Sequence, residues 1–204
     1  MKRRAIIIMS VSRGNLHLII GPMFSGKSSL MLGAVERYAR AGRKCIIIRH
    51  GRDHRDGERA TMRTHAGHIH DMVPIARSSS LTDAETARAI DASDVIGVDE
   101  MQFFAMYDED IARAVASAIE EWLLRGKIII CAGLDADWQR EPFAVIALLV
   151  CAADRVTKLL AVCTRCGADA QCSARTLFDD AYSDPVGGRE KYEAQCRECY
   201  RAAM

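Results

Sequence analysis

The sequence carries almost no net charge and few aromatic residues. It contains 28 Lys and Arg against 27 Asp and Glu, a formal net charge of +1, and aromatic residues make up 6% of the chain. A protein that binds nucleic acid typically presents a basic surface with aromatic side chains for stacking. Because both features are weak here, the composition argues against a nucleic-acid partner.

Long apolar runs are also lacking. No stretch reaches the roughly 18 apolar residues that a membrane-spanning helix needs, so we expect no membrane partner. Met1–Arg4 followed by Ala5–Met9 resembles a secretory signal, but the apolar part is too short and no small-residue cleavage site precedes Arg13. We expect residues 1–14 to form an N-terminal extension and the protein to be cytoplasmic.

Apolar residues and cysteines, by contrast, are plentiful. Half of the 204 residues are hydrophobic, which allows one domain with a proper core and a small appendage. Eight cysteines in a chain without a signal indicate a reducing compartment. In that setting thiols bind metals or pack in the core.

The motif around which the chain is organised is Gly21-Pro22-Met23-Phe24-Ser25-Gly26-Lys27-Ser28. It fits G-x-x-x-x-G-K-[ST], between a strand pattern at 16–20 and a helix pattern at 29–40. This arrangement aims backbone N–H groups and the positive end of a helix dipole at a polyanion. We expect residues 21–28 to bind ATP, with Lys27 on the β- and γ-phosphates and the Ser28 hydroxyl on Mg²⁺.

An acidic pair, Asp99 and Glu100, ends the hydrophobic strand pattern at 95–98, which Asp94 precedes. In P-loop folds a carboxylate at the end of such a strand holds Mg²⁺ beside the P-loop hydroxyl. We therefore predict that Asp99 and Ser28 share the magnesium ion.

Strand and helix patterns alternate from residue 16 to about 160. Further segments with such patterns are 44–48, 84–91, 111–124, 127–132 and 144–153, the last fitting either a helix or a strand. We expect Gly42 and Gly126 to end helices. The alternation predicts an α/β fold over 15–160, a P-loop-type parallel sheet flanked by helices, with ligands at the carboxyl ends of the strands.

Residues 49–71 form a polar stretch with five histidines. Clustered histidines could bind a metal, but no cysteine or carboxylate pattern accompanies them. We favour a polar loop, and a loop of this length in a compact domain is often a lid.

The C-terminal region contains two C-x-x-C pairs, Cys163 with Cys166 and Cys196 with Cys199. Such pairs predict four thiolate ligands of one structural Zn²⁺, and disulfides are the alternative. Cys172 fits neither pair.

The segment between the pairs has many turn residues and little periodicity. We predict a small zinc-binding domain over 161–204 in which the metal closes an irregular loop at its base. We expect the P-loop, built on the sheet, to be independent of this domain.

Four motifs in this order resemble the type II thymidine kinases, the cellular and poxvirus-like family: GPMFSGKS at 21–28, DEMQFF at 99–104, GLDADWQREPF at 133–143 and the two C-x-x-C pairs. The resemblance covers residues 16–200. It implies transfer of the γ-phosphoryl group of ATP to the 5′-hydroxyl of thymidine, and more weakly of deoxyuridine. It also implies a homotetramer with thymidine triphosphate (dTTP) as feedback inhibitor.

The resemblance also implies roles for individual residues. Glu100 matches the catalytic base. The resemblance adds three residues to the predicted ATP site: Arg55, which lies in the lid, Asp99 and Gln102. The C-terminal domain matches a zinc-binding lasso. The residues implied in thymidine binding are Met23, Phe103, Leu134, Trp138, Phe143, Tyr192 and the lasso residues Ser183, Asp184, Pro185, Val186 and Gly187.

The chain departs from the family pattern at Met101, Trp138, Pro185 and 172–175. Pro185 has no N–H, so a kinase for another nucleoside is one alternative. A non-enzymatic ATP switch with a zinc ribbon for nucleic acid is another, which the mixed charges of 163–204 disfavour. Phe103, Phe104 and Phe143 could also be core residues, the favoured interpretation for Phe104.

Overall fold

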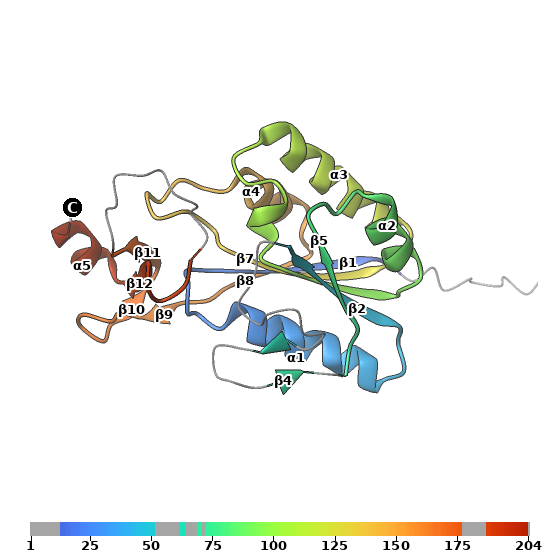
Figure 1. Cartoon of the computed structure of the whole chain (residues 1–204), viewed down its shortest axis with the longest axis horizontal. Helices are drawn as coiled ribbons and strands as arrows, with labels where there is room; N and C mark the ends of the chain where they lie inside the picture. Colours follow the sequence, from blue (N-terminus) through green and yellow to red (C-terminus); the bar gives the residue numbers. More distant parts are fainter. Residues whose placement is uncertain (1–12, 52–61, 64–68, 71, 177–186, 204) are drawn as a thin grey trace, which may run out of the picture.

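The computed structural model describes residues 13–51, 62–63, 69–70, 72–176 and 187–203. Within them a six-stranded sheet has helices on both faces and short strands at one end (Figure 1). The sheet consists of β1 (Asn15–Ile20), β2 (Cys45–His50), β5 (Ile75–Ser78), β6 (Val95–Asp99), β7 (Ile128–Gly133) and β8 (Arg155–Lys158). The helices around it are α1 (Lys27–Arg40), α2 (Ala84–Asp91), α3 (Glu109–Leu124) and α4 (Ala144–Ala152).

The sheet has the strand order β5-β2-β6-β7-β1-β8, and every pairing in it is parallel. The predicted parallel α/β sheet is therefore confirmed. Ile20 at the end of β1 pairs with Gly133 at the end of β7, and β7 pairs with β6 on its other side. The loops that follow β1, β6 and β7 consequently leave the same edge of the sheet.

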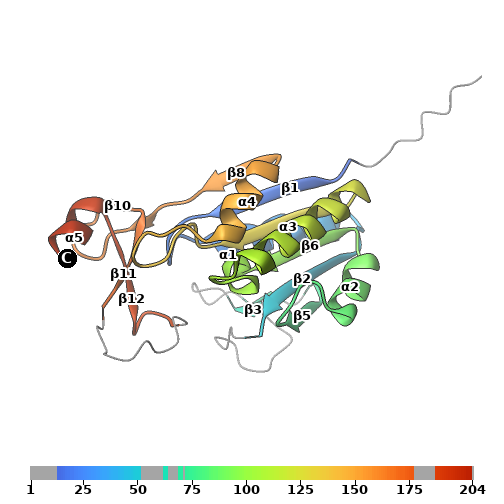
Figure 2. The ribbon, with the colours of Figure 1, turned by 90° about the horizontal axis from the view of Figure 1, so that it is seen from above.

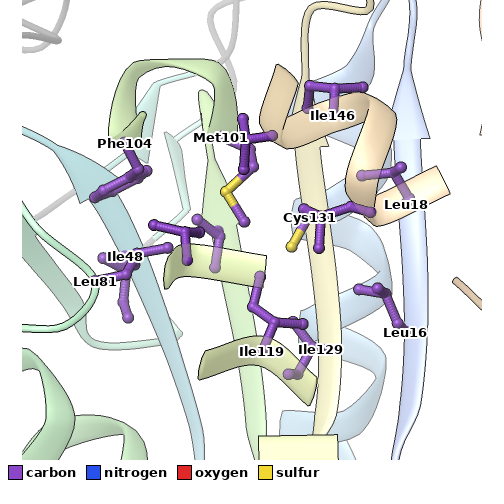
Figure 3. Close-up of a cluster of buried hydrophobic side chains, with 14 of the residues drawn as sticks. Leu16, Leu18, Ile48, Leu81, Met101, Phe104, Ile119, Ile129, Cys131 and Ile146 are labelled. Atoms are coloured by element: carbon purple, nitrogen blue, oxygen red, sulfur yellow. The ribbon is translucent and has the colours of Figure 1, made fainter. Parts of the chain in front are cut away.

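The two faces of the sheet carry separate parts of the core. On one face, Met31 and Val35 of α1 pack in a cluster with Ile47 of β2. On the other face, Ile119 of α3 and Ile146 of α4 lie over the strands (Figure 3). Met101, at a position where the resembled family has a small residue, is fully buried in this second cluster. The segment at 144–153, whose sequence fits either a helix or a strand, forms the helix α4.

The helix boundaries follow local sequence signals. Asp83 and Asp108 cap α2 and α3, because their carboxylates accept hydrogen bonds from N–H groups of the first turn. Helices α1 and α3 end just before Gly42 (φ 79°) and Gly126 (φ 80°), whose left-handed backbone costs a glycine little. Both glycine stops were predicted correctly.

The polar stretch at 49–71 contains more regular structure than expected. Strand β2 runs on through Arg49 and His50, which are 2% and 6% exposed because β2 lies between β5 and β6. Further along, β3 (Met62–Arg63) and β4 (Ile69–His70) form an antiparallel pair. The prediction of a loop from residue 49 was wrong because the last two residues of the strand are polar.

A group of short elements lies beyond the carboxyl ends of β1 and β7 (Figures 1 and 2). We call its described residues, 161–176 and 187–203, the cysteine module. Strand β9 (Ala161–Val162) pairs with β10 (Asp169–Ala170), β11 (Cys172–Arg175) pairs with β12 (Tyr192–Gln195), and α5 (Arg197–Ala202) follows.

The cysteine module corrects one expectation. The segment between the two cysteine pairs was predicted to be an irregular loop that a metal closes at its base. Instead, the β11–β12 ladder also joins its two sides. Both strands are only four residues long, and β11 consists mostly of small side chains, so they give no clear periodic signal. A domain boundary at 160–161 stays a prediction.

None of the helices formed by the described residues has the length and apolarity needed to cross a bilayer.

Candidate active site

The P-loop lies between the end of β1 and the first turn of α1. Phe24 has φ 65°, a left-handed conformation that residues with a side chain rarely adopt. The carbonyl of Pro22 accepts hydrogen bonds from the Ser25 hydroxyl (2.8 Å) and the Lys27 ammonium (2.7 Å). Lys27 is 8% exposed. The loop thus holds a cation against its own backbone, beside a helix N-terminus that favours anions.

Two glycines allow the P-loop its shape. Gly21 has φ 144°, and a Cβ there would lie 2.4 Å from the carbonyl oxygen of Leu159. Gly26 has φ 86° and precedes α1 directly. A side chain at Gly21 would force the loop away from the backbone at Leu159, just after β8, and one at Gly26 would strain the turn.

Ser28 and Asp99 come together from different elements. The Ser28 hydroxyl, in the first turn of α1, donates a 2.8 Å hydrogen bond to Oδ1 of Asp99, the last residue of β6. Asp99 is 1% exposed. A hydroxyl and a carboxylate are oxygen ligands of the kind that Mg²⁺ prefers. The donor set at this point therefore fits the predicted magnesium site.

Glu100 follows Asp99 with a left-handed backbone (φ 54°, ψ 48°). Its Oε2 accepts a 2.6 Å hydrogen bond from the side-chain amide of Gln102, whose own oxygen accepts a 3.0 Å bond from the N–H of Leu134. Gln102 is completely buried. A non-glycine residue in this conformation persists only where its surroundings hold it, and here the Gln102 amide ties Glu100 to the loop after β7.

Sequence reasoning assigned Gln102 to the ATP site but missed its position between Glu100 and Leu134. The signal was a single amide in the otherwise apolar run 101–105. A polar side chain there must find buried partners.

Phe103 and Phe104 lie near His50, at the end of β2. The Phe103 ring centroid is 5.8 Å from that of His50, and the Phe104 centroid is 5.0 Å away in an edge-on arrangement. Phe104 is 4% exposed and belongs to the core, as favoured from the sequence, whereas Phe103 is only half-buried.

Phe143 and Tyr192 are both buried, 8% and 6% exposed. Phe143 belongs to the core cluster of the sheet, whereas Tyr192 opens β12 opposite Arg175. Tyr107, which sequence reasoning did not single out, places its ring centroid 5.8 Å from that of Phe143 while its side chain is 64% exposed. An aromatic residue left largely in solvent beside this edge of the sheet is a further candidate for contact with a ligand.

Trp138 connects the loop after β7 to the cysteine module. Its carbonyl accepts a 2.6 Å hydrogen bond from the hydroxyl of Tyr200 in α5. Its ring lies under the guanidinium of Arg175, whose Cζ is 5.8 Å from the ring centroid. Leu134 and Trp138 in this loop are both half-buried.

The P-loop also touches the cysteine module, which corrects the expectation that the two are independent. The N–H of Met23 donates a 2.9 Å hydrogen bond to the hydroxyl of Ser173 in β11. The Phe24 side chain packs against the cluster that contains Cys163 and Cys196. The expectation was wrong because these contacts join residues about 140 to 170 positions apart, beyond the reach of any local pattern.

The four predicted zinc ligands converge. Cys163, Cys166, Cys196 and Cys199 have all of their sulfur atoms within 4.8 Å of one another, and the Cys166 and Cys196 sulfurs are 3.6 Å apart. Zn–S bonds of about 2.3 Å in a tetrahedron imply sulfur separations near 3.8 Å. The cluster could therefore hold a metal ion. Cys172 is buried and stays outside it, and all eight cysteines are free thiols.

The thiols of this cluster differ in acidity. Hydrogen bonds from backbone N–H groups, that of Cys196 first, lower the pKa of Cys163 to about 6. Side-chain hydrogen bonds with the neighbouring thiols, Cys196 first and then Cys166, raise the pKa of Cys199 to about 12, because a thiol that donates such a bond loses it on ionisation. A bound cation favours the deprotonated form of its thiol ligands, so four converging thiols suit a metal whose ligands are thiolates.

Some predicted site residues lie outside the described residues: Arg55, Ser183, Asp184, Pro185 and Val186. Gly187 is described and is half-buried.

Comparison with known proteins gives one consistent result. A family model for thymidine kinase matches residues 14–200. The chain is 40% identical to the thymidine kinase of Myxoma virus (strain Lausanne) over 192 residues, which are 94% of this chain and 99% of the viral protein. It is 37% identical to that of Sheeppox virus (strain KS-1) over 187 residues, 92% of this chain and 97% of the viral protein.

Solved structures show a weaker likeness. Domain III of the Thermotoga maritima replication initiation protein DnaA has a TM-score of 0.44 and 15% sequence identity, over 72% of this chain and 55% of that chain. A likeness at this level supports no conclusion about function.

Proposed function

Because this chain belongs to the thymidine kinase family, we propose that it transfers the γ-phosphoryl group of ATP to the 5′-hydroxyl of thymidine, giving dTMP and ADP. The observation that carries the proposal is the 2.8 Å hydrogen bond from Ser28 to Asp99 beside the buried Lys27. These are the groups that a P-loop phosphotransferase uses to hold its nucleotide.

The P-loop and Lys27 hold the ATP phosphates, and catalysis is mainly positioning and electrostatic stabilisation. Ser28 and Asp99 hold Mg²⁺, which neutralises charge on the phosphates when bound. Arg55 contributes from the predicted lid. Gln102 acts by fixing Glu100, a role supported by its 2.6 Å bond to that carboxylate.

Glu100 is the proposed catalytic base. A bond forms between the 5′-oxygen and the γ-phosphorus while the bond from that phosphorus to the oxygen of the leaving ADP breaks. The 5′-hydroxyl proton passes to the Glu100 carboxylate. A carboxylate is a far weaker base than an alkoxide, so Glu100 orients the hydroxyl and accepts the proton late, once the new P–O bond has made it acidic.

Thymidine is proposed to lie between the sheet and the cysteine module. The groups assigned to it are Met23, Phe103, Leu134, Trp138, Phe143, Tyr192 and the lasso residues 183–187. Support comes from the contacts that link these elements, namely Trp138 with Arg175 and Tyr200, and Met23 with Ser173.

The remaining parts of the proposal rest on family membership. The four cysteines hold a structural Zn²⁺, the enzyme is a cytoplasmic homotetramer, and dTTP acts as feedback inhibitor.

The apolar side chains proposed around the base predict a graded specificity. One methyl group in an apolar pocket discriminates by about 10- to 200-fold, so deoxyuridine should react with kcat/KM lower than thymidine by that factor. Deoxycytidine should be rejected more strongly, because its amine leaves polar groups around the base unpaired.

The direct test is steady-state phosphorylation of the four deoxynucleosides with Mg-ATP, with the products identified as 5′-monophosphates. Lys27→Ala serves as the inactive control. A rate for deoxycytidine equal to that for thymidine would overturn the substrate assignment. Absence of transfer to any of the four would overturn the kinase assignment.

A further inference from the structure

The side of the P-loop that faces the cysteine module is held by that module. Phe24 packs against a buried cluster of small residues, Ala161, Cys163, Ala170, Ala194 and Cys196. The guanidinium of Arg189 lies over the Phe24 ring, with its Cζ 5.5 Å from the centroid. Phe24 keeps a left-handed backbone (φ 65°), which persists only where its surroundings fix it. Phe24 lies in the middle of the P-loop, so the cysteine module holds the centre of the phosphate-binding loop.

A hydrogen bond fixes the neighbouring residue. The N–H of Met23 donates to the hydroxyl of Ser173 over 2.9 Å, and Ser173 is only 6% exposed. In the β11–β12 ladder Ser173 pairs with Ala194, two residues before the predicted metal ligand Cys196. A short, continuous path therefore leads from the cysteine cluster through two strands to the P-loop backbone.

These contacts fix the part of the P-loop backbone that is proposed to bind the phosphates of ATP. A P-loop binds phosphate through backbone N–H groups that must converge on one point. Lys27 and Ser25 fix the loop through the Pro22 carbonyl, whereas Met23 and Phe24 are fixed by the cysteine module. A site whose backbone is already in the binding conformation spends less free energy on ordering when the ligand binds.

We propose that the cysteine module positions the P-loop, with Ser173 as the main positioning residue and Arg189 as a weaker one. ATP affinity then depends on a residue that lies outside the P-loop in the sequence. This inference rests on the ATP-binding part of the proposed function and goes beyond it, because it assigns the module a role in holding phosphate.

The test compares three variants at this junction. Ser173→Ala removes the acceptor of the Met23 N–H, whereas Ser173→Thr keeps a hydroxyl. Thr176→Ala is the matched control, because Thr176 is an exposed residue of the same module with its hydroxyl 3.5 Å from the carbonyl of Glu190. The measurement is the Kd of a non-hydrolysable ATP analogue with Mg²⁺, by titration calorimetry in the absence of nucleoside.

We expect Ser173→Ala to weaken analogue binding by about 5- to 30-fold, the factor that corresponds to loss of one buried hydrogen bond. Ser173→Thr and Thr176→Ala should stay within about twofold of the unmodified protein. Analogue binding by Ser173→Ala equal to that by Thr176→Ala overturns the inference and leaves the proposed function intact. Absence of analogue binding by the unmodified protein overturns both.

A second variant keeps the inference testable if Ser173→Ala does not fold. Arg189→Ala removes an exposed cation from the Phe24 ring, which should weaken analogue binding by about 2- to 5-fold. Unchanged affinity in that variant would count against the positioning role of the module.

Discussion

The sheet region and the cysteine module differ in what holds each of them together. The two faces of the sheet bury large aliphatic side chains such as Leu16, Leu18, Met31, Ile96 and Ile129. The clusters of the module consist mostly of small residues: Ala161, Cys163, Ala170, Ala194 and Cys196 in one, and Cys172, Ala174 and Tyr200 in the other.

This difference decides where stability comes from. A fully buried leucine or isoleucine stabilises a fold by about 1.5–3 kcal/mol, and an alanine by much less. The module therefore lacks the apolar area to order itself. Binding of Zn²⁺ to four thiolates is worth about 10–16 kcal/mol in zinc-finger peptides, so a metal at the four cysteines can supply what burial does not. The sheet region needs no such help.

The sheet region and the cysteine module also differ in the ligand that each is proposed to bind. The sheet edge presents the groups proposed to act on phosphate, Lys27, Ser28, Asp99 and Glu100, whereas the module and the loop after β7 flank the proposed thymidine site. The contact between Met23 and Ser173 shows that the two regions are nevertheless joined at the P-loop.

The largest effect should follow from Glu100→Gln, which separates chemistry from binding within the sheet region. Loss of a general base lowers kcat by about 10²- to 10⁴-fold, while ATP and thymidine affinities should change little. Steady-state kinetics and equilibrium titration measure the two quantities. Glu141→Gln, an exposed residue beside α4, is the control, and a normal kcat for Glu100→Gln would remove Glu100 from the mechanism.

A smaller effect is expected from Gln102→Leu, which cuts the link between Glu100 and the loop after β7. Hydrogen bonds to charged groups contribute about 1.5–3 kcal/mol, so kcat/KM for thymidine should fall by roughly 10- to 100-fold. The Kd of the ATP analogue should stay within about twofold. Gln139→Leu, on the exposed part of the same loop, should leave both unchanged. A loss of analogue affinity equal to the loss of kcat/KM would instead favour direct contact of Gln102 with ATP.

The smallest effect concerns the stability of the sheet region alone. Hydrogen bonds, from the Ser78 hydroxyl first and then from the N–H and hydroxyl of Thr86, lower the pKa of Asp83 to about 2. Because the folded pKa lies below the unfolded value near 3.9, this carboxylate stabilises the fold fully above pH 4 and loses that effect as the pH falls toward 2.

Thermal unfolding of Asp83→Asn checks this prediction. The unmodified protein should melt at a higher temperature at pH 6, and the difference should shrink between pH 4 and pH 2. Asp110→Asn, another exposed acidic residue near a helix start, should show a smaller pH dependence. A difference in melting temperature that stays constant from pH 6 to pH 2 would contradict the role assigned to the charge of Asp83.

Sequence reasoning predicted the parts of the molecule that local patterns encode. The parallel sheet, the glycine stops of α1 and α3 and the meeting of Ser28 with Asp99 follow from periodicity and motif order. The convergence of the four cysteines follows from their spacing. The bond of Gln102 to Glu100 and the contact of Ser173 with Met23 could not be predicted, because each depends on how separate elements pack. The β11–β12 ladder was missed for a different reason: its strands are only four residues long, too short for a clear periodic pattern.

The measurement that tests the division between the two regions most directly is a pair of titrations on Cys166→Ser, with thymidine and with a non-hydrolysable ATP analogue. Cys151→Ser, an exposed thiol on α4, is the control. We expect Cys166→Ser to lose detectable thymidine binding, because the module is no longer held by a metal. Analogue binding should weaken by about 5- to 30-fold, because the P-loop loses the contacts of Met23 and Phe24. Affinities for both ligands equal to those of Cys151→Ser would contradict this account.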